Sequence, residues 1–144
     1  MKVRCVNNTG EYLRNFEYES LPDNKLGRFG AFKSSYYGGI TPGKEYLVMG
    51  IFILKDSQAY LLDDDGMISA VPCQLFEIID NTVSPNWKFR LVEKDEVVYP
   101  FTQAVFGYEE LVTDKTTWEN LVEGNPEYER IYLLRKKEAE QKQL

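Results

Sequence analysis

The sequence contains no histidine and only two cysteines among its 144 residues. Histidine is the commonest general base and metal ligand, so its absence removes the Ser-His and Cys-His catalytic arrangements. Cys5 and Cys73 alone cannot form a structural zinc site, which needs four ligands. The glycines at 27, 30 and 38–39 lack the lysine and the strand-to-helix context of a phosphate-binding loop. We therefore expect a protein that is not an enzyme and uses no metal or cofactor.

Long apolar runs are also missing. The longest apolar stretch, 46–54, is interrupted by Gly50 and is far shorter than the roughly 20 residues that span a bilayer. The first six residues lack the apolar run of a signal peptide. We expect a cytoplasmic protein that does not associate with membranes. In that reducing compartment Cys5 and Cys73 are expected to be separate thiols rather than a disulfide.

Positive charge is in deficit, with 17 Lys and Arg against 23 Asp and Glu, which gives a net charge of -6. Binding to nucleic acid usually requires a basic stripe that displaces counterions from phosphates, so nucleic acid is an unfavourable partner for this chain. A basic protein is a better expected partner. The composition leaves the oligomeric state open.

Aromatic residues are abundant, with ten Tyr and eight Phe, and they favour strands. Residues 1–7 alternate between apolar and polar side chains, as in a half-buried strand. The turn at 41–44 combines a proline with Gly43, which is the pattern of a type II turn. The further elements expected up to residue 80 are strands at 45–54, 57–62, 67–71 and 76–80, a turn at 63–66 and a short 3₁₀ turn at 72–76.

The pattern changes after Asn81. Alternation predicts a strand at 87–91, with 97–99 as its pairing partner across a turn at 93–96. From Tyr108 the chain becomes helical, with a first helix starting near Thr113 and ending at Gly124. A second helix starts at Asn125-Pro126. We expect Tyr128, Ile131 and Leu134 to line its buried face.

Several of these motifs resemble small bacterial and phage SH3-like domains. They are MKVRCVNN at 1–8, TPGKEY at 41–46, YLLDDDG at 60–66, VP at 71–72 and LFEIID at 75–80. The resemblance implies an α+β, mainly antiparallel SH3-like β-barrel built from residues 1–8 and 41–80. Within one domain of 1–144, residues 9–40 are then a long insertion after the first strand, 81–107 add extra strands, and 108–144 form a C-terminal helical extension. These motifs specify structure rather than function.

The run Asp63-Asp64-Asp65 is the strongest candidate for chemistry, because clustered carboxylates bind Mg²⁺ or Ca²⁺. The alternative is a hairpin turn in which Asp bonds its own backbone and Gly66 completes the bend. We favour the turn.

The acidic excess lies in one segment. Residues 108–129 contain seven acids and one base, Lys115, which accounts for the whole net charge. An acidic helical face beside exposed Tyr108 and Trp118 would suit docking on a basic partner. The alternative is that these acids only favour helix N-termini and that Trp118 belongs to the core. The candidate partner-binding residues are Tyr108, Glu109, Glu110, Asp114, Glu119, Glu123, Tyr36 and Tyr37.

Tyr36 and Tyr37 belong to an aromatic set in the glycine-rich insertion, together with Phe29 and Phe32. Such a segment either forms a binding loop or covers an open face of the barrel. The sequence leaves both possibilities open.

The leading hypothesis is a non-enzymatic protein-binding protein, an immunity or inhibitor protein that neutralises a basic partner such as a bacterial toxin. The alternative is an SH3-like regulatory module in nucleic-acid transactions or phage function. That alternative requires a basic stripe opposite the acidic helices, formed by Lys2, Arg4, Lys44, Lys55, Lys88 and Arg90.

Overall fold

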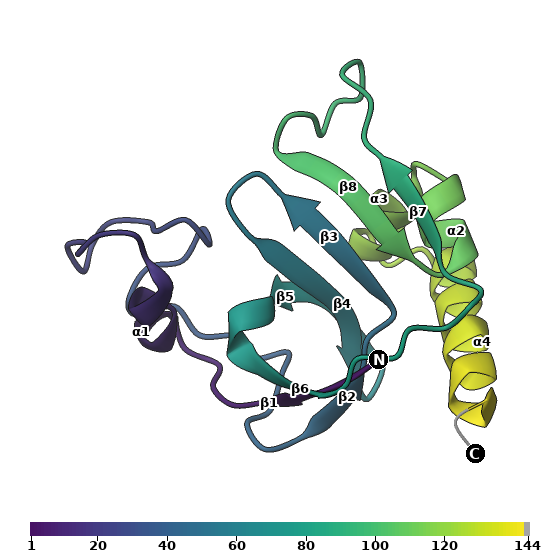
Figure 1. Cartoon of the computed structure of the whole chain (residues 1–144), viewed down its shortest axis with the longest axis horizontal. Helices are drawn as coiled ribbons and strands as arrows, with labels where there is room; N and C mark the ends of the chain where they lie inside the picture. Colours follow the sequence, from purple (N-terminus) through teal and green to yellow (C-terminus); the bar gives the residue numbers. More distant parts are fainter. Residues whose placement is uncertain (143–144) are drawn as a thin grey trace.

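The computed structural model describes residues 1–142, and within them the chain forms two antiparallel sheets and four α-helices (Figure 1). The strands are β1 (Lys2–Cys5), β2 (Glu45–Leu47), β3 (Gly50–Leu54), β4 (Gln58–Asp64), β5 (Met67–Pro72), β6 (Phe76–Asp80), β7 (Lys88–Leu91) and β8 (Thr102–Gly107). The helices are α1 (Gly10–Leu13), α2 (Glu109–Thr113), α3 (Thr117–Val122) and α4 (Pro126–Lys142), with 3₁₀ helices η1 (Arg14–Phe16) and η2 (Cys73–Leu75).

The smaller sheet has the strand order β2-β1-β6, and the larger has the order β5-β4-β3-β8-β7. All pairings are antiparallel, so the expected α+β, mainly antiparallel class is confirmed. Neither sheet closes into a barrel within residues 1–142. The strand expected at 45–54 is interrupted at Val48 and Met49, and its two halves enter different sheets.

The two turns expected from glycine and proline are present, but the second one has different bounds. Gly43 has φ of 87°, and the Lys44 N–H donates to the Thr41 carbonyl at 3.1 Å. The hairpin turn after β4 is narrower than the expected 63–66. Only Asp65 and Gly66 lie outside the strands, with φ of 49° and 94°, as in a two-residue hairpin turn. The first two acids of the triplet therefore belong to β4.

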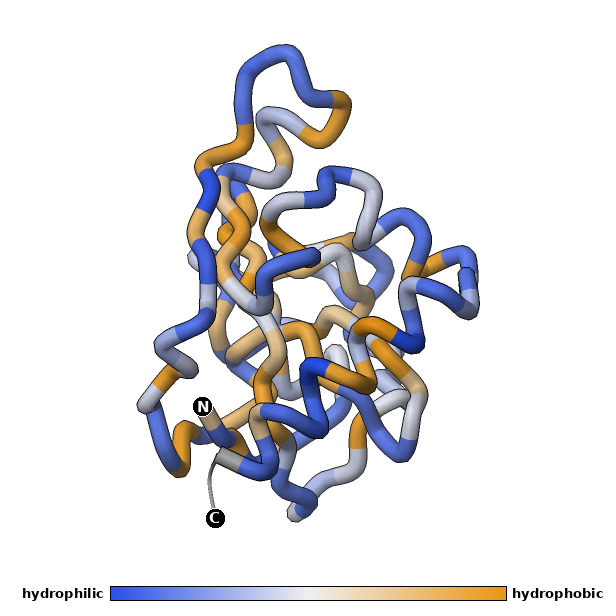
Figure 2. Tube along the Cα trace, turned by 90° about the vertical axis from the view of Figure 1, so that its right-hand side faces the viewer, coloured by the Kyte–Doolittle hydropathy of each residue, from blue (hydrophilic) through white to orange (hydrophobic). Residues whose placement is uncertain are grey.

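The expected pairing of 87–91 with 97–99 is wrong. β7 pairs with β8 at 102–107, and β8 joins it to β3. Residues 93–101 form a loop instead, because Glu96 turns back to accept hydrogen bonds from Arg90 at 2.8 Å and from the Glu93 N–H at 2.6 Å. This loop, at the top of Figure 2, exposes hydrophobic residues such as Val97.

Strand β4 is buried on both faces, because a separate hydrophobic cluster packs against each face of the larger sheet. Tyr60 and Leu62 pack with the β1 and β6 side chains in one cluster. Ala59 and Leu61 face the opposite way and pack against the helices in a second cluster. Alternation along a strand produces this division, since successive side chains point to opposite faces. The second cluster holds α2, α3 and α4 on the larger sheet.

A pair of glycines lets α2 approach the sheet. Gly50 and Gly107 are directly opposite each other in the β3–β8 register. A Cβ on Gly107 would lie 2.7 Å from the Met49 carbonyl oxygen and 2.8 Å from a Leu111 methyl group. The absent side chains make room for Leu111, and they place Tyr108, the residue before α2, inside the protein.

Helix α4 lies along the protein with Tyr132 as its most deeply buried side chain (Figure 1). The sequence analysis missed Tyr132 and placed Leu134 on the buried face, whereas Leu134 is 44% exposed. Tyr128 and Ile131 are half-buried and pack against the second cluster, as expected. The half-buried Arg135 lies beside Tyr132, next to the position that the pattern assigned to Leu134. Tyr132 and Arg135 are placed there by carboxylates on other elements.

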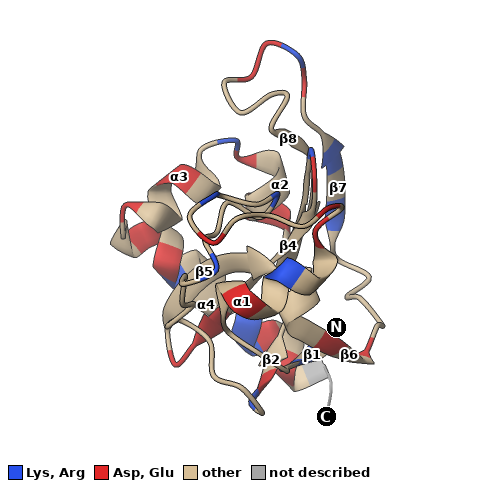
Figure 3. Ribbon diagram, turned by 90° about the vertical axis from the view of Figure 1, so that its left-hand side faces the viewer, with Lys and Arg blue, Asp and Glu red and all other residues tan. Residues whose placement is uncertain are grey.

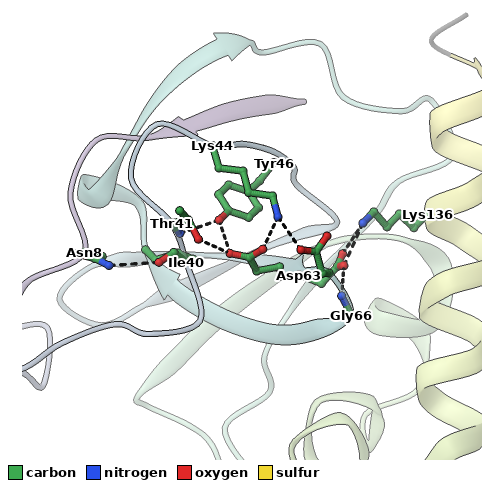
Figure 4. Close-up of polar contacts among 10 residues, drawn as sticks. Asn8, Ile40, Thr41, Lys44, Tyr46, Asp63, Gly66 and Lys136 are labelled. Carbon is green, nitrogen blue, oxygen red and sulfur yellow. Dashed lines mark hydrogen bonds and ion pairs between the residues drawn. The ribbon is translucent and has the colours of Figure 1, made fainter.

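The carboxylate of Asp63 is the anchor for α4 (Figure 4). Asp63 is 6% exposed and binds Lys136 Nζ at 2.8 Å, the Tyr132 hydroxyl at 2.9 Å and the Gly66 N–H at 2.9 Å. Burial raises the pKa of Asp63, but the hydrogen bonds from Lys136, Gly66 and Tyr132 outweigh burial and hold this pKa below its ordinary value. The charge is therefore compensated, although almost no water reaches it.

The neighbouring Asp64 binds three side chains from the turn at 41–44 and from β2, which Figure 4 labels. Its carboxylate accepts hydrogen bonds from Lys44, from the Tyr46 hydroxyl at 2.7 Å and from the Thr41 hydroxyl at 2.8 Å. These bonds, with that of Lys44 the largest, lower the pKa of Asp64 to about 2. They join the turn at 41–44 and β2 to the β4–β5 hairpin.

Replacing Asp63 by Ala is expected to lower the free energy of unfolding by about 3 kcal/mol, because it leaves Lys136 and Tyr132 without their common acceptor. Urea denaturation measures this. Asp95→Ala, on the exposed loop, serves as the control and is expected to change stability by less than about 0.5 kcal/mol. In the double variant Asp63→Ala/Lys136→Met the losses are expected to be less than additive; strict additivity would show that the pair is not coupled.

Because the folded-state pKa of Asp64 is below that of the unfolded chain, its contribution to stability is full above about pH 4 and is lost as the pH falls towards 2. Asp64→Asn is therefore expected to be less stable than the wild type at neutral pH and to lose less stability over that acid range. Thermal unfolding at several pH values measures both effects. Equal acid sensitivity in the two proteins would contradict the assignment, and Asp95→Asn provides the reference.

Candidate binding surface at the C-terminal helices

Three of the seven acids in 108–129 are engaged within the protein. Glu110 accepts two hydrogen bonds from Arg135, at 2.9 and 2.6 Å, and this guanidinium lowers its pKa. Asp114 accepts from Thr116 and from the Tyr128 hydroxyl at 2.9 Å, which connects the start of α3 to α4. Glu127 pairs with Arg130 one turn later on α4. The carboxylates of Glu110 and Asp114 therefore connect α2 and the segment after it to α4, whereas the exposed pair of Glu127 lies within α4.

The other four carboxylates make no ion pair with any residue of the described chain. They are Glu109, Glu119, Glu123 and Glu129. We call the group on α3 and the start of α4, formed by Glu119, Glu123 and Glu129, the acidic face. Acidic residues recur along α3 in Figure 3, whereas the basic residues of β7 lie on the other side of that view. Val122, 65% exposed, adds an apolar side chain to the acidic face.

The aromatic anchors expected beside these acids are less exposed than assumed. Tyr108 is 4% exposed, because the glycine pair under α2 draws it against Tyr132, whose ring centroid lies 5.9 Å away. Trp118 is half-buried and packs on Phe52 at 5.3 Å. The assumption that Tyr108 is exposed is therefore wrong, and a flat surface contact through its ring is excluded.

Some aromatic residues of the insertion cover the core, and others face solvent as in a binding loop. Phe29 and Tyr37 pack against the core cluster around β1, so they cover it. Tyr36 is 72% exposed and Phe32 is also exposed, so they face solvent. Of the two tyrosines proposed for partner binding, Tyr36 is accessible, whereas Tyr37 mainly supports the core.

A cleft of about 350 Å³ lies beside Tyr108. Its walls are the β6–β7 loop, the corner between β2 and β3, and the C-terminal half of α4. Its volume falls in the range of known ligand sites. Trp87 lines it and packs edge-on against Phe106 at 5.0 Å. The sequence analysis missed this cleft, because its walls lie far apart in the sequence and no motif connects them.

Polar groups of two kinds reach this cleft. Arg135 lines it but is already bound by Glu110 and Glu138. Glu109 and Lys88 also line it and make no ion pair within the described residues. The hydroxyl of Tyr108 is buried and has no hydrogen-bond partner in the described part of the chain. Burial and the charge of Glu110 raise its pKa, so it remains a neutral hydroxyl.

The acids of the triplet do not form a metal site. In residues 1–142 no cluster of three metal-ligating side chains is found. Asp63 is bound by Lys136, and Lys44 binds both Asp64 and the exposed Asp65, the latter at 3.2 Å.

The basic stripe required by the nucleic-acid alternative is neutralised at three of its six positions. Arg4 pairs with Glu45 and Glu77, with distances of 3.3 and 2.8 Å. Lys44 and Arg90 are paired with carboxylates as well. Half of the six cations are therefore compensated by carboxylates, whereas Lys2, Lys55 and Lys88 make no ion pair within the described residues.

Comparison with protein-family models, with curated proteins and with solved structures finds no match for this chain. Among the described residues, no helix is both long enough and apolar enough to cross a membrane. Cys5 and Cys73 are free thiols, and burial raises the pKa of both.

Tyr108 and Tyr132, whose rings pack edge to face, allow a matched test of this geometry. Tyr132→Phe removes the hydrogen bond to Asp63 and is expected to cost about 2 kcal/mol of unfolding free energy, as for bonds to charged groups. Tyr108→Phe removes an unpaired buried hydroxyl and is expected to be neutral or to stabilise by up to about 1 kcal/mol. Urea denaturation compares the two. A larger loss for Tyr108→Phe would contradict the unpaired assignment.

Proposed function

We propose that this chain is a non-enzymatic, cytoplasmic protein-binding protein, an immunity or inhibitor protein that neutralises a basic partner such as a bacterial toxin. The observation that carries the proposal is the acidic face, whose three carboxylates make no ion pair among the described residues. Glu119 and Glu123 are exposed, and Glu129 is half-buried. Such a surface accelerates encounter with a basic protein, and the exposed Val122 offers an apolar contact after docking. The histidine-free sequence supports a binding role.

The position of Glu123 distinguishes this proposal from the alternative that the acids only stabilise the helices. Glu119 and Glu129 lie in the first turns of α3 and α4, where an acid is favoured by the helix dipole. Glu123 instead lies at the C-cap of α3, where the dipole disfavours negative charge. Helix stability does not account for this carboxylate, whereas a basic partner would.

We further propose that β1 to β6 form an SH3-like scaffold for this face. The support is the motif order of the sequence and the way the chain passes from β2 in one sheet to β3 in the other. The 3₁₀ turn η2 between β5 and β6 agrees with the same arrangement.

A pull-down from the native host tests the function. The wild type is expected to retain a basic protein, and retention should fall as salt rises. Glu119→Gln/Glu123→Gln is expected to weaken the affinity about three- to tenfold at low salt without loss of stability. The control Asp56→Asn/Asp95→Asn removes the same charge from loops outside the acidic face. The proposal fails if no basic protein is retained, or if both double variants behave alike.

A further inference from the structure

Strand β7 is an edge of the larger sheet, with β8 on one side and no strand on the other within residues 1–142 (Figure 1). Its side chains Phe89 and Leu91 are 60% and 67% exposed. We propose that this edge pairs with the same edge of a second copy of the chain, antiparallel and with the two-fold axis at Arg90. This inference goes beyond the proposed function and does not depend on the acidic face.

The ladder between β7 and β8 determines which backbone groups of the edge are open. The Val92 N–H donates to the Gln103 carbonyl at 3.0 Å, and this pair continues the β7–β8 register. Hydrogen-bonded pairs alternate along an antiparallel ladder, so Arg90 also directs its N–H and C=O groups to β8. Phe89 and Leu91 direct theirs away from it. Within residues 1–142 no other hydrogen bond engages the N–H or C=O groups of these two residues.

The open groups match those of a second copy. With the axis at Arg90, Phe89 of each copy lies opposite Leu91 of the other in a hydrogen-bonded pair. These two pairs use both open N–H groups and both open carbonyls of each copy. A two-fold contact therefore satisfies the whole edge, and assembly stops at two chains because no open edge of β7 remains.

The neighbouring registers conflict with bonds that are already present. An axis at Phe89 would require the backbone of Trp87, whose N–H donates to the Ser84 carbonyl at 3.1 Å. An axis at Leu91 would require the backbone of Glu93, whose N–H is bound by the Glu96 carboxylate at 2.6 Å. The open segment is thus limited at both ends, and the register with Arg90 at the centre is the one that it permits.

The side chains of the edge are compatible with this register. Phe89 and Leu91 lie on the sheet face away from α2, where the Phe89 ring packs edge-on against Phe106 at 6.0 Å. Pairing brings each exposed Phe89 opposite an exposed Leu91, and such cross-strand pairs of aromatic and aliphatic side chains are stabilising. Apolar surface that faces water in the single chain is thereby covered.

The charges on the other face of β7 are complementary between copies. Like charges directly opposite each other destabilise a strand pair, but Arg90, which meets its own copy at the axis, is bound twice by Glu96 at 2.8 Å. Lys88 makes no ion pair within the described residues and comes to the end of β7 in the other copy, beside Glu93. The Glu93 side chain is 70% exposed, and its nearest cation is Lys115 at 3.9 Å.

Strand β6, an edge of the smaller sheet, is a less suitable surface although Ile78 and Ile79 are also exposed. Its pairing with β1 shifts register between Lys2 and Val3. Such irregularities bend and twist an edge strand and hinder pairing with another chain. The β7–β8 ladder has no register shift.

Sedimentation equilibrium of the full chain over a range of concentrations is the first test, and the apparent mass is expected to rise from one chain to two. Phe89→Lys and Leu91→Glu should each weaken the association at least about tenfold, because the two-fold axis applies every substitution twice. Met67→Lys, at an exposed apolar position on β5 at the opposite edge of the same sheet, is the matched control and should have no effect. A single-chain mass at all concentrations, or equal weakening by the control, would overturn the inference.

The double variant Phe89→Lys/Leu91→Glu tests the register itself. With the axis at Arg90 it places unlike charges opposite each other in both pairs, so it should associate more tightly than either single variant. An axis at Phe89 or at Leu91 would instead place like charges together. Urea denaturation of each variant verifies that it is folded. Weaker association of the folded double variant than of the single variants would contradict the proposal.

Amide hydrogen exchange, measured by NMR at low and high protein concentration, identifies the groups that form the contact. Exchange at the Phe89 and Leu91 N–H groups is expected to slow several-fold as the concentration rises. The Arg90 N–H, which is bonded to β8 in each chain, should be protected equally at both concentrations. Exchange at Phe89 and Leu91 that is independent of concentration would exclude β7 as the contact.

Discussion

The buried carboxylate of Asp63 is the constraint on which the arrangement of the helices depends. It lies on β4, the strand with a core on each face, so water cannot solvate it. Its partners Tyr132 and Lys136 lie 69 and 73 residues later in the chain, on α4. Removing a charge from water is costly unless good hydrogen bonds compensate it. The position of α4 is therefore determined by a charge on the sheet as much as by apolar packing.

The docking of α4 through Asp63 also affects the acidic face and the cleft beside Tyr108. With Tyr132 and Lys136 directed at the sheet, Arg135 reaches Glu110 and thereby fixes α2. Ala139, one turn further on, then faces the cleft. Acids that serve this packing are compensated, and those on the acidic face make no ion pair within the described residues. The same helix thus separates the structural carboxylates from the exposed ones.

Local patterns predicted much of the framework. The alternation in 1–7, the glycine turn at 41–44 and the Asn-Pro start of α4 each depend on neighbouring residues alone, and the structure contains all three. The partner of β7 was predicted wrongly, because Glu96 turns 93–101 into a loop only when Arg90 is near it in space. Of the candidate site, the acidic residues were identified, but not which of them are paired.

What the sequence by itself determined is therefore the fold class, most of the strands before residue 81, the start of α4, and the concentration of negative charge in 108–129. These follow from periodicity, turn chemistry and composition, all of which act over short distances along the chain. The burial of Tyr108, the compensation of Asp63 and the cleft lined by Trp87 were decided only by the tertiary structure. Each requires segments more than 20 residues apart to meet, and no local pattern encodes which of them do.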